Sequence, residues 1–270
     1  MPGDRASTLD PVQDRVGSMS LFPNLDNQGF LVVNGTRGIM PTLILSAARR
    51  HATIVYTVDP QDERAAEQLA QQIAAAGLSS QVSFIVTNLA DEEDIDQLYD
   101  VALERLPSLD VLIHNLESRA VWEQRRLVDI SLDEWNGVLK TELRLPFMLS
   151  QKAVEEYLCA GTPGRIVFVA YSGCGSGAFT SAQTGLRALA RCINKEFGRR
   201  EIGCNAVIVH AKDMMNGQSP VYPDGHVASD LVDTVLFLGS QESSFVNGEM
   251  LDIEVQRWNG GSDMGDEDHA

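Results

Sequence analysis

The sequence predicts an α/β fold in which helices cover both faces of one parallel sheet. Short apolar runs rich in β-branched residues alternate with helical patterns along the 270 residues. The first such unit, Gly29 to Arg50, reads as a strand, a glycine-containing turn and a helix. Apolar and charged contents of 44% and 22% are globular values. Together these observations predict a single doubly wound domain with right-handed crossovers.

Each predicted element rests on its own periodicity. Strands are expected at 30–33, 53–58, 82–86, 111–113, 166–170, 204–209 and 250–253. Helices are expected from Ile39 and over 63–75, 91–106, 132–157, 181–197 and 228–238, with a kink or helix junction at Pro146. Residues 1–28 are predicted to be a flexible lead-in, 29–258 the domain, and 259–270 an acidic tail.

Composition excludes several classes of function. The net charge of −17 argues against binding to nucleic acid or to an anionic membrane. The four cysteines show no C-x-x-C pair, which favours reduced thiols over a metal site or disulfide framework. Neither a signal-peptide pattern nor an apolar run of membrane-spanning length is present, so we expect a cytoplasmic protein.

The glycine-containing turn after the first strand reads Asn34-Gly35-Thr36-Arg37-Gly38. In a dinucleotide-binding unit, such glycines let the backbone approach a pyrophosphate at the helix N-terminus. The fingerprint is incomplete, because Met40 stands where the third glycine is expected. The turn therefore predicts either a cofactor site or a connection that binds nothing.

The second strand ends at Asp59-Pro60, about 20 residues beyond the glycines. An acid at this place can hold the ribose 2′-OH of NAD, whereas Arg37 could meet the 2′-phosphate of NADP. The two residues suggest opposite cofactors. Asp59 is equally well explained as a turn residue before Pro60.

Taken together, the elements resemble the short-chain dehydrogenase/reductase family, with the general pattern of 3-oxoacyl carrier-protein reductases, from Phe30 to Trp258. The ordered landmarks are Asp110–Asn115, Leu132–Trp135, Pro146–Gln151, Gly164–Val169 and Phe245–Asp252. The resemblance implies a Rossmann-type fold, NAD or NADP as cofactor if any is bound, and an oligomer built on the long helices at 132–157 and 181–197. It would place cofactor contacts at Gly35, Arg37, Gly38, Ile39, Asp59, Asn88 and Asn115.

The family's catalytic pair, Tyr-x-x-x-Lys, is replaced here by Phe179 and Gln183. Phenylalanine carries no exchangeable proton, and a neutral glutamine cannot lower the pKa of a neighbour as a cation would. The cofactor side also departs from the family pattern. Its altered positions are Val33-Asn34 at the start of the turn, Met40, Asn88, Glu117 and His210-Ala211.

Other residues could act in the same crevice. The catalytic candidates are Ser172 near the family's serine, Tyr171 as a substitute acid, and Glu142 as a base if it is buried. The simpler interpretations are that Tyr171 packs at a strand end and that Glu142 is a solvated or helix-paired charge. His114 and His210 are expected to make local hydrogen bonds, and the scattered histidines predict no metal site.

Three functional hypotheses follow. The chain is a non-redox member, acting as a binding subunit or as the partner of an active family member in a homo- or hetero-oligomer. Alternatively, it is an NAD(P)-dependent oxidoreductase with a substitute proton donor. In the third hypothesis, the chain is an isomerase, cyclase or dehydratase that binds a small-molecule substrate in the crevice where the family binds its own substrates.

Overall fold

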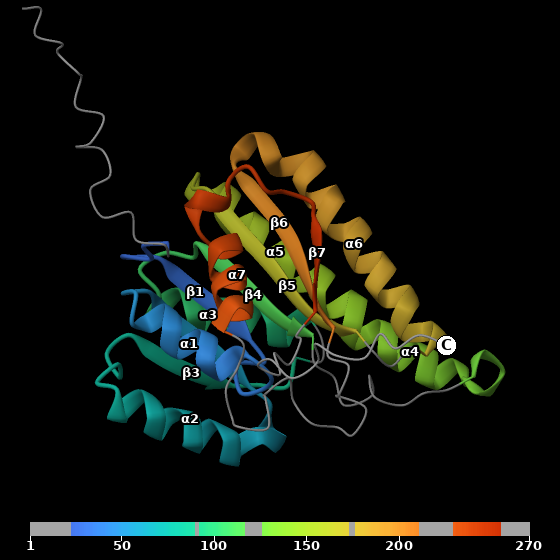
Figure 1. Ribbon diagram of the computed structural model, residues 1–270, viewed down its shortest axis with the longest axis horizontal. Helices are drawn as coiled ribbons and strands as arrows, with labels where there is room; N and C mark the ends of the chain where they lie inside the picture. The colour runs from blue at the N-terminus through green and yellow to red at the C-terminus, as the bar shows by residue number, and fades with distance from the viewer. Residues whose placement is uncertain (1–22, 90–91, 117–125, 173–175, 211–228, 255–270) are drawn as a thin grey trace, which may run out of the picture.

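The computed structural model describes residues 23–89, 92–116, 126–172, 176–210 and 229–254. Within these ranges, one parallel sheet has the strand order β3-β2-β1-β4-β5-β6-β7 (Figure 1). Its strands are β1 (Gly29–Val33), β2 (Thr53–Val58), β3 (Val82–Val86), β4 (Val111–Leu116), β5 (Gly164–Ser172), β6 (Ile202–His210) and β7 (Met250–Glu254). The α-helices are α1 (Met40–Ala48), α2 (Glu63–Ala75), α3 (Glu92–Arg105), α4 (Leu132–Leu139), α5 (Leu145–Ala160), α6 (Gly177–Phe197) and α7 (Ser229–Gly239). The predicted doubly wound sheet is confirmed.

Alternation of side chains along each strand divides the core into two layers. On β1, Phe30 and Val32 face one layer, which α1, α2 and α7 cover. Leu31 and Val33 face the other, which α3, α5 and α6 cover. A sheet buried on both faces explains why its strands read as continuous apolar runs rather than as alternating patterns.

The helical stretch predicted over 132–157 is interrupted at the predicted place. A π-helical turn, η5 (Lys140–Arg144), separates α4 from α5, and Pro146 lies in the first turn of α5. Proline has no N–H and crowds the carbonyl four residues earlier, so it cannot continue a regular helix. The N–H of Leu145 instead bonds to the carbonyl of Lys140, five residues earlier.

The N-terminal boundary differs from the prediction. Leu25 is fully buried in the core layer of α1, so the folded unit begins before residue 29. Residues 1–22 and 259–270 lie outside the described residues. Within the described ranges, every helix is too short or too polar to cross a bilayer.

Candidate functional site

A pocket of about 140 Å³ lies at the carboxyl ends of β1 to β4. This edge of a doubly wound sheet is where ligands generally bind. The pocket brings together six residues that the sequence singled out: Asn34, Arg37, Asp59, Asn88, His114 and Glu142. Its remaining lining consists of Thr87, Leu89, Leu116, Thr141 and Leu145.

The glycine-containing turn is held by side chains rather than left open. Asn34 has a φ of 59° and Gly38 a φ of 56°, so these two residues supply the left-handed conformations of the turn. Gly35 has a packing role, because a Cβ there would lie 2.7 Å from the Cβ of Tyr56. Buried Asn115 donates from its amide to the carbonyls of Arg37 and Asn34, at 3.2 and 3.4 Å. Asn115 therefore fixes the turn from the neighbouring strand β4.

Arg37 and Asp59, which suggested opposite cofactors, form an ion pair with each other. The Arg37 Nη2 lies 3.4 Å from the Asp59 Oδ2, and Arg37 Nε donates to Asp62 in a second, closer ion pair. Asp59 also accepts a hydrogen bond of 2.8 Å from the N–H of Gln61, as expected of a turn residue before Pro60. Sequence reasoning missed Asp62, although its spacing after Asp59 and the cation in the facing turn could have indicated the cluster.

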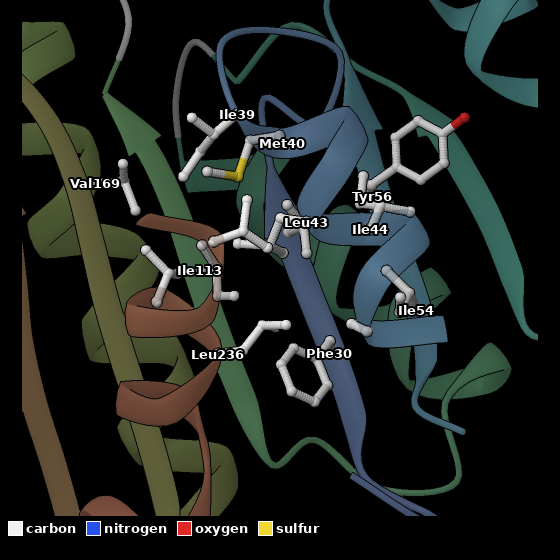
Figure 2. Close-up of a cluster of buried hydrophobic side chains, with 14 of the residues drawn as sticks. Phe30, Ile39, Met40, Leu43, Ile44, Ile54, Tyr56, Ile113, Val169 and Leu236 are labelled. Atoms are coloured by element: carbon white, nitrogen blue, oxygen red, sulfur yellow. The ribbon is translucent and has the colours of Figure 1, made fainter. Parts of the chain in front are cut away.

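The first two residues of α1 offer no free N–H to a pyrophosphate. The N–H of Met40 bonds to the carbonyl of Arg37, Pro41 has no N–H, and the N–H of Leu43 bonds to the carbonyl of Ile39. Figure 2 shows the Met40 side chain between α1 and the sheet, beside Ile39 and Leu43, and both Ile39 and Met40 are fully buried. The bulk of Met40 thus fills the layer between helix and strands that a glycine would leave open.

These features do not fit a nicotinamide dinucleotide, the cofactor that the resemblance implies. The cation in the turn is already paired with two acids, and the buried Ile39 and Met40 side chains pack the start of the helix. The pocket of about 140 Å³ is also smaller than the roughly 300–1,000 Å³ typical of ligand pockets.

Phe179 and Gln183, which the resemblance assigns to the positions of the family's catalytic pair, lie one turn apart at the start of α6. Ser176 caps this helix by accepting a hydrogen bond from the N–H of Phe179, whose side chain is 3% exposed. Gln183 donates from Nε2 to the carbonyl of Tyr171 at 3.0 Å. The Tyr171 side chain is itself fully buried in the core layer of α1 and α7. Gln183 thus links α6 to the end of β5, and Phe179 is buried in the first turn of α6.

Glu142 and His114 are buried at the wall of the pocket. Glu142, in the π-helical turn η5, is 4% exposed, which excludes a solvated charge and meets the condition of burial set for its role as a base. Thr141 donates to its Oε1 at 3.4 Å. Burial lowers the pKa of His114 to about 3, which keeps the imidazole neutral. Its Nδ1 has no hydrogen-bond partner, so the local hydrogen bond expected there is not made.

Of the other sequence candidates, the structure describes the backbone of Ser172 and the side chain of His210. Ser172 ends β5, where its backbone pairs in register with His210 of β6. The Nε2 of His210 lies 2.7 Å from Asp252 Oδ1 on β7, which confirms the local hydrogen bond expected of His210. The Ser172 side chain and the whole of Glu117 lie outside the described residues.

Comparison with known proteins agrees with this architecture. The family described as enoyl-(acyl carrier protein) reductase matches residues 35–255. The short-chain dehydrogenase/reductase eriH of Hericium erinaceus is 24% identical, over 86% of this chain and 98% of its own length. The 3-oxoacyl-[acyl-carrier-protein] reductase FabG of Staphylococcus aureus is 26% identical, over 83% and 95%.

Solved structures show the same fold. A protein of Bacillus thuringiensis described as a 3-oxoacyl reductase has a TM-score of 0.73 and 21% identity, over 84% of this chain and 96% of its own. Levodione reductase has a TM-score of 0.71 and 19% identity, over 85% and 96%. The sheet order, the site at its carboxyl edge and a family match over most of the chain lead to one conclusion: this protein belongs to the short-chain dehydrogenase/reductase family.

Proposed function

We propose that this protein is a family member that has lost hydride transfer through the tyrosine–lysine pair. It serves as a non-redox or partner subunit in acyl or secondary metabolism. One observation carries the proposal: at the two positions of the pair, Phe179 is buried and Gln183 bonds to the carbonyl of Tyr171. Neither side chain can pass a proton to or from a substrate oxygen.

An exposed apolar surface on α5 supports the role of a subunit. Phe147 is 48% exposed and Leu158 is 39% exposed. Eleven residues are close to three helical turns, so both side chains lie on one face of the helix. Exposed Gln151 and Glu155 lie between them, so the face offers two separate apolar contacts within a polar surface. We therefore propose that α5 contributes to a homo-oligomer or to a complex with an active family member.

The proposal is tested by measuring reduction of a 3-oxoacyl thioester by NADPH or NADH. Purified protein is mixed with NADPH or NADH and a 3-oxoacyl thioester, and loss of absorbance at the nicotinamide band is followed, with an active 3-oxoacyl reductase as positive control. We expect background rates with both cofactors. Turnover comparable to that of the control would contradict the proposal and favour an NAD(P)-dependent oxidoreductase with a substitute proton donor.

A non-redox enzyme is the second candidate, and the pocket favours it. Glu142 and His114 are both buried in its wall, where carboxylates and neutral imidazoles can exchange protons with a bound substrate. The test is deuterium uptake at C2 of a 3-oxoacyl thioester in D₂O. A rate above the spontaneous one, lost in Glu142→Gln and kept in the exposed-site control Glu104→Gln, would support this candidate.

A further inference from the structure

Three adjacent strands carry polar residues at the carboxyl edge of the sheet. β5 ends at Ser172, and β6 ends at His210, whose Cα lies opposite that of Ser172 in the parallel register. Asp252 lies on β7, the next strand of the sheet (Figure 1). The Nε2 of His210 lies 2.7 Å from the Oδ1 of Asp252. A serine, a histidine and an aspartate therefore follow one another across β5, β6 and β7.

The three positions belong to the face of the sheet that α6 covers. On β6, Ile208 packs in the core layer of α3, α5 and α6, so His210, two residues later, lies on the same face. On β7, Ile253 packs in the opposite layer, which places its neighbour Asp252 on the α6 face. Positions in register on parallel strands share a face, so position 172 belongs to this face as well.

The contact between His210 and Asp252 fixes which nitrogen of the imidazole is basic. An ionised carboxylate only accepts hydrogen bonds, so the neutral imidazole donates to Asp252 from Nε2. Nδ1 is then the nitrogen that takes a proton. The His210 side chain is 36% exposed and that of Asp252 is 58% exposed, so a substrate can reach the imidazole from solvent. An imidazole held by a carboxylate in this way is the arrangement that activates a hydroxyl nucleophile.

We propose that Ser172, His210 and Asp252 form a nucleophilic site that hydrolyses carboxylic esters or thioesters. The hydroxyl oxygen of Ser172 attacks the acyl carbon while Nδ1 of His210 takes its proton. The bond from the acyl carbon to the leaving oxygen or sulfur breaks, and the alcohol or thiol departs with that proton. Water then attacks the acyl-serine and gives a proton to Nδ1, which passes it to the serine oxygen as the carboxylic acid is released. Asp252 is a positioning residue that holds the imidazole in the required tautomer.

The N-terminus of α6 lies at the same edge of the sheet. α6 begins at Gly177, shortly after the end of β5, and Ser176 caps it by accepting a hydrogen bond from the N–H of Phe179. The N-terminus of an α-helix carries a partial positive charge. Acyl transfer passes through a tetrahedral intermediate with negative charge on the former carbonyl oxygen, which such a charge stabilises. The start of α6 therefore favours acyl transfer at the end of β5.

This site goes beyond the non-redox role of the chain and does not depend on it. Acyl hydrolysis uses no nicotinamide cofactor and neither of the residues at 179 and 183. Hydride transfer is judged by oxidation of NADPH or NADH, and the acyl site is judged by covalent labelling of a serine and by ester hydrolysis. Either proposal can therefore fail while the other stands.

The test uses the full chain and a fluorophosphonate, a probe that phosphonylates activated serines with loss of fluoride. Labelling is followed by intact-mass spectrometry, and the labelled residue is identified by peptide mapping. We expect one phosphonate on the folded wild type, attached to Ser172, and none on the heat-denatured protein. Ser172→Ala should abolish labelling, whereas Ser181→Ala, which removes an exposed hydroxyl from α6, should leave its rate within about twofold of wild type.

Two further variants test the imidazole and the carboxylate. His210→Gln should slow labelling about hundredfold, because the proton of the attacking hydroxyl loses its acceptor. Asp252→Asn should lower kcat for hydrolysis of p-nitrophenyl butyrate about tenfold while KM stays within about twofold, because the tautomer changes and substrate binding does not. The matched controls are His51→Asn and Asp100→Asn, both at exposed positions, which should behave as wild type.

The proposal is overturned if the folded wild type is labelled no faster than the heat-denatured protein, or if the label lies on a residue other than Ser172. It is also overturned if folded His210→Gln and His210→Asn, judged by circular dichroism, keep the wild-type labelling rate. Equal kcat in folded Asp252→Asn and wild type would likewise contradict it, since the contact with His210 would then only fasten β7 to β6.

Discussion

Mild acid should destabilise this protein through one buried histidine. Burial lowers the pKa of His114 to about 3, against 6.5 for an exposed imidazole. As the pH falls below about 6.5, the unfolded chain binds a proton at this site, and the folded protein does so only near pH 3. The unfolded state therefore binds more protons throughout this window, and stability falls as the pH falls. Between pH 7 and pH 5 the loss is about 2 kcal/mol.

The assay is thermal unfolding at pH 7, 6 and 5, where a loss of about 2 kcal/mol lowers Tm by roughly 4–8 °C for a domain of this size. His114→Asn should remove most of this pH dependence, whatever it does to Tm at pH 7. His51→Asn is the matched control, since His51 is exposed at a φ of 67° that asparagine tolerates. If His114→Asn lost as much stability between pH 7 and pH 5 as the wild type, the histidine would not be the cause.

Two further predictions concern stability. Gly164→Ala should cost about 1–3 kcal/mol, because the new Cβ would lie 2.3 Å from Cδ2 of the buried Tyr157 ring. Gly137→Ala, with nothing within 4 Å, should instead be neutral or stabilising in urea unfolding; equal effects would contradict the packing argument. Asn115→Ala should cost about 1–3 kcal/mol, because the carbonyls of the glycine-containing turn lose their buried donor. Exposed Asn136→Ala is its control, and a midpoint shift no larger than that of the control would refute the role of Asn115.

The local pattern of apolar and turn residues was sufficient to predict most elements of the fold. The bounds predicted for β2, α2 and β3 agree with the observed 53–58, 63–75 and 82–86, because apolar periodicity and flanking turn residues act together there. The junction at Pro146 was predictable from proline chemistry alone. Leu25 was missed because a single core contact from a polar segment has no periodicity to reveal it.

The candidate site was predictable as a place but not as a set of contacts. Because Arg37, Asp59 and His114 lie at or just after the ends of predicted strands, the sequence predicts them at one edge of the sheet, and all three line the pocket. That the two charges pair with each other, and that Asp62 joins them, depends on side-chain directions that a linear pattern does not carry. The sequence left open whether Glu142 is solvated or buried for the same reason, since its burial depends on how the π-helical turn packs against the sheet.

The proposed function predicts that introducing tyrosine and lysine at 179 and 183 will not produce turnover, because Phe179 is buried and Gln183 bonds to the backbone of β5. In the double variant Phe179→Tyr with Gln183→Lys, the first substitution adds a hydroxyl to a ring that is 3% exposed. The second replaces the glutamine that donates to the carbonyl of Tyr171. Arg37 remains paired with acids, and Met40 still fills the layer beneath the helix start. We expect NADPH oxidation with a 3-oxoacyl thioester to stay at the wild-type background. Turnover recovered in this variant would show that only the proton relay had been lost and that the cofactor side had remained functional.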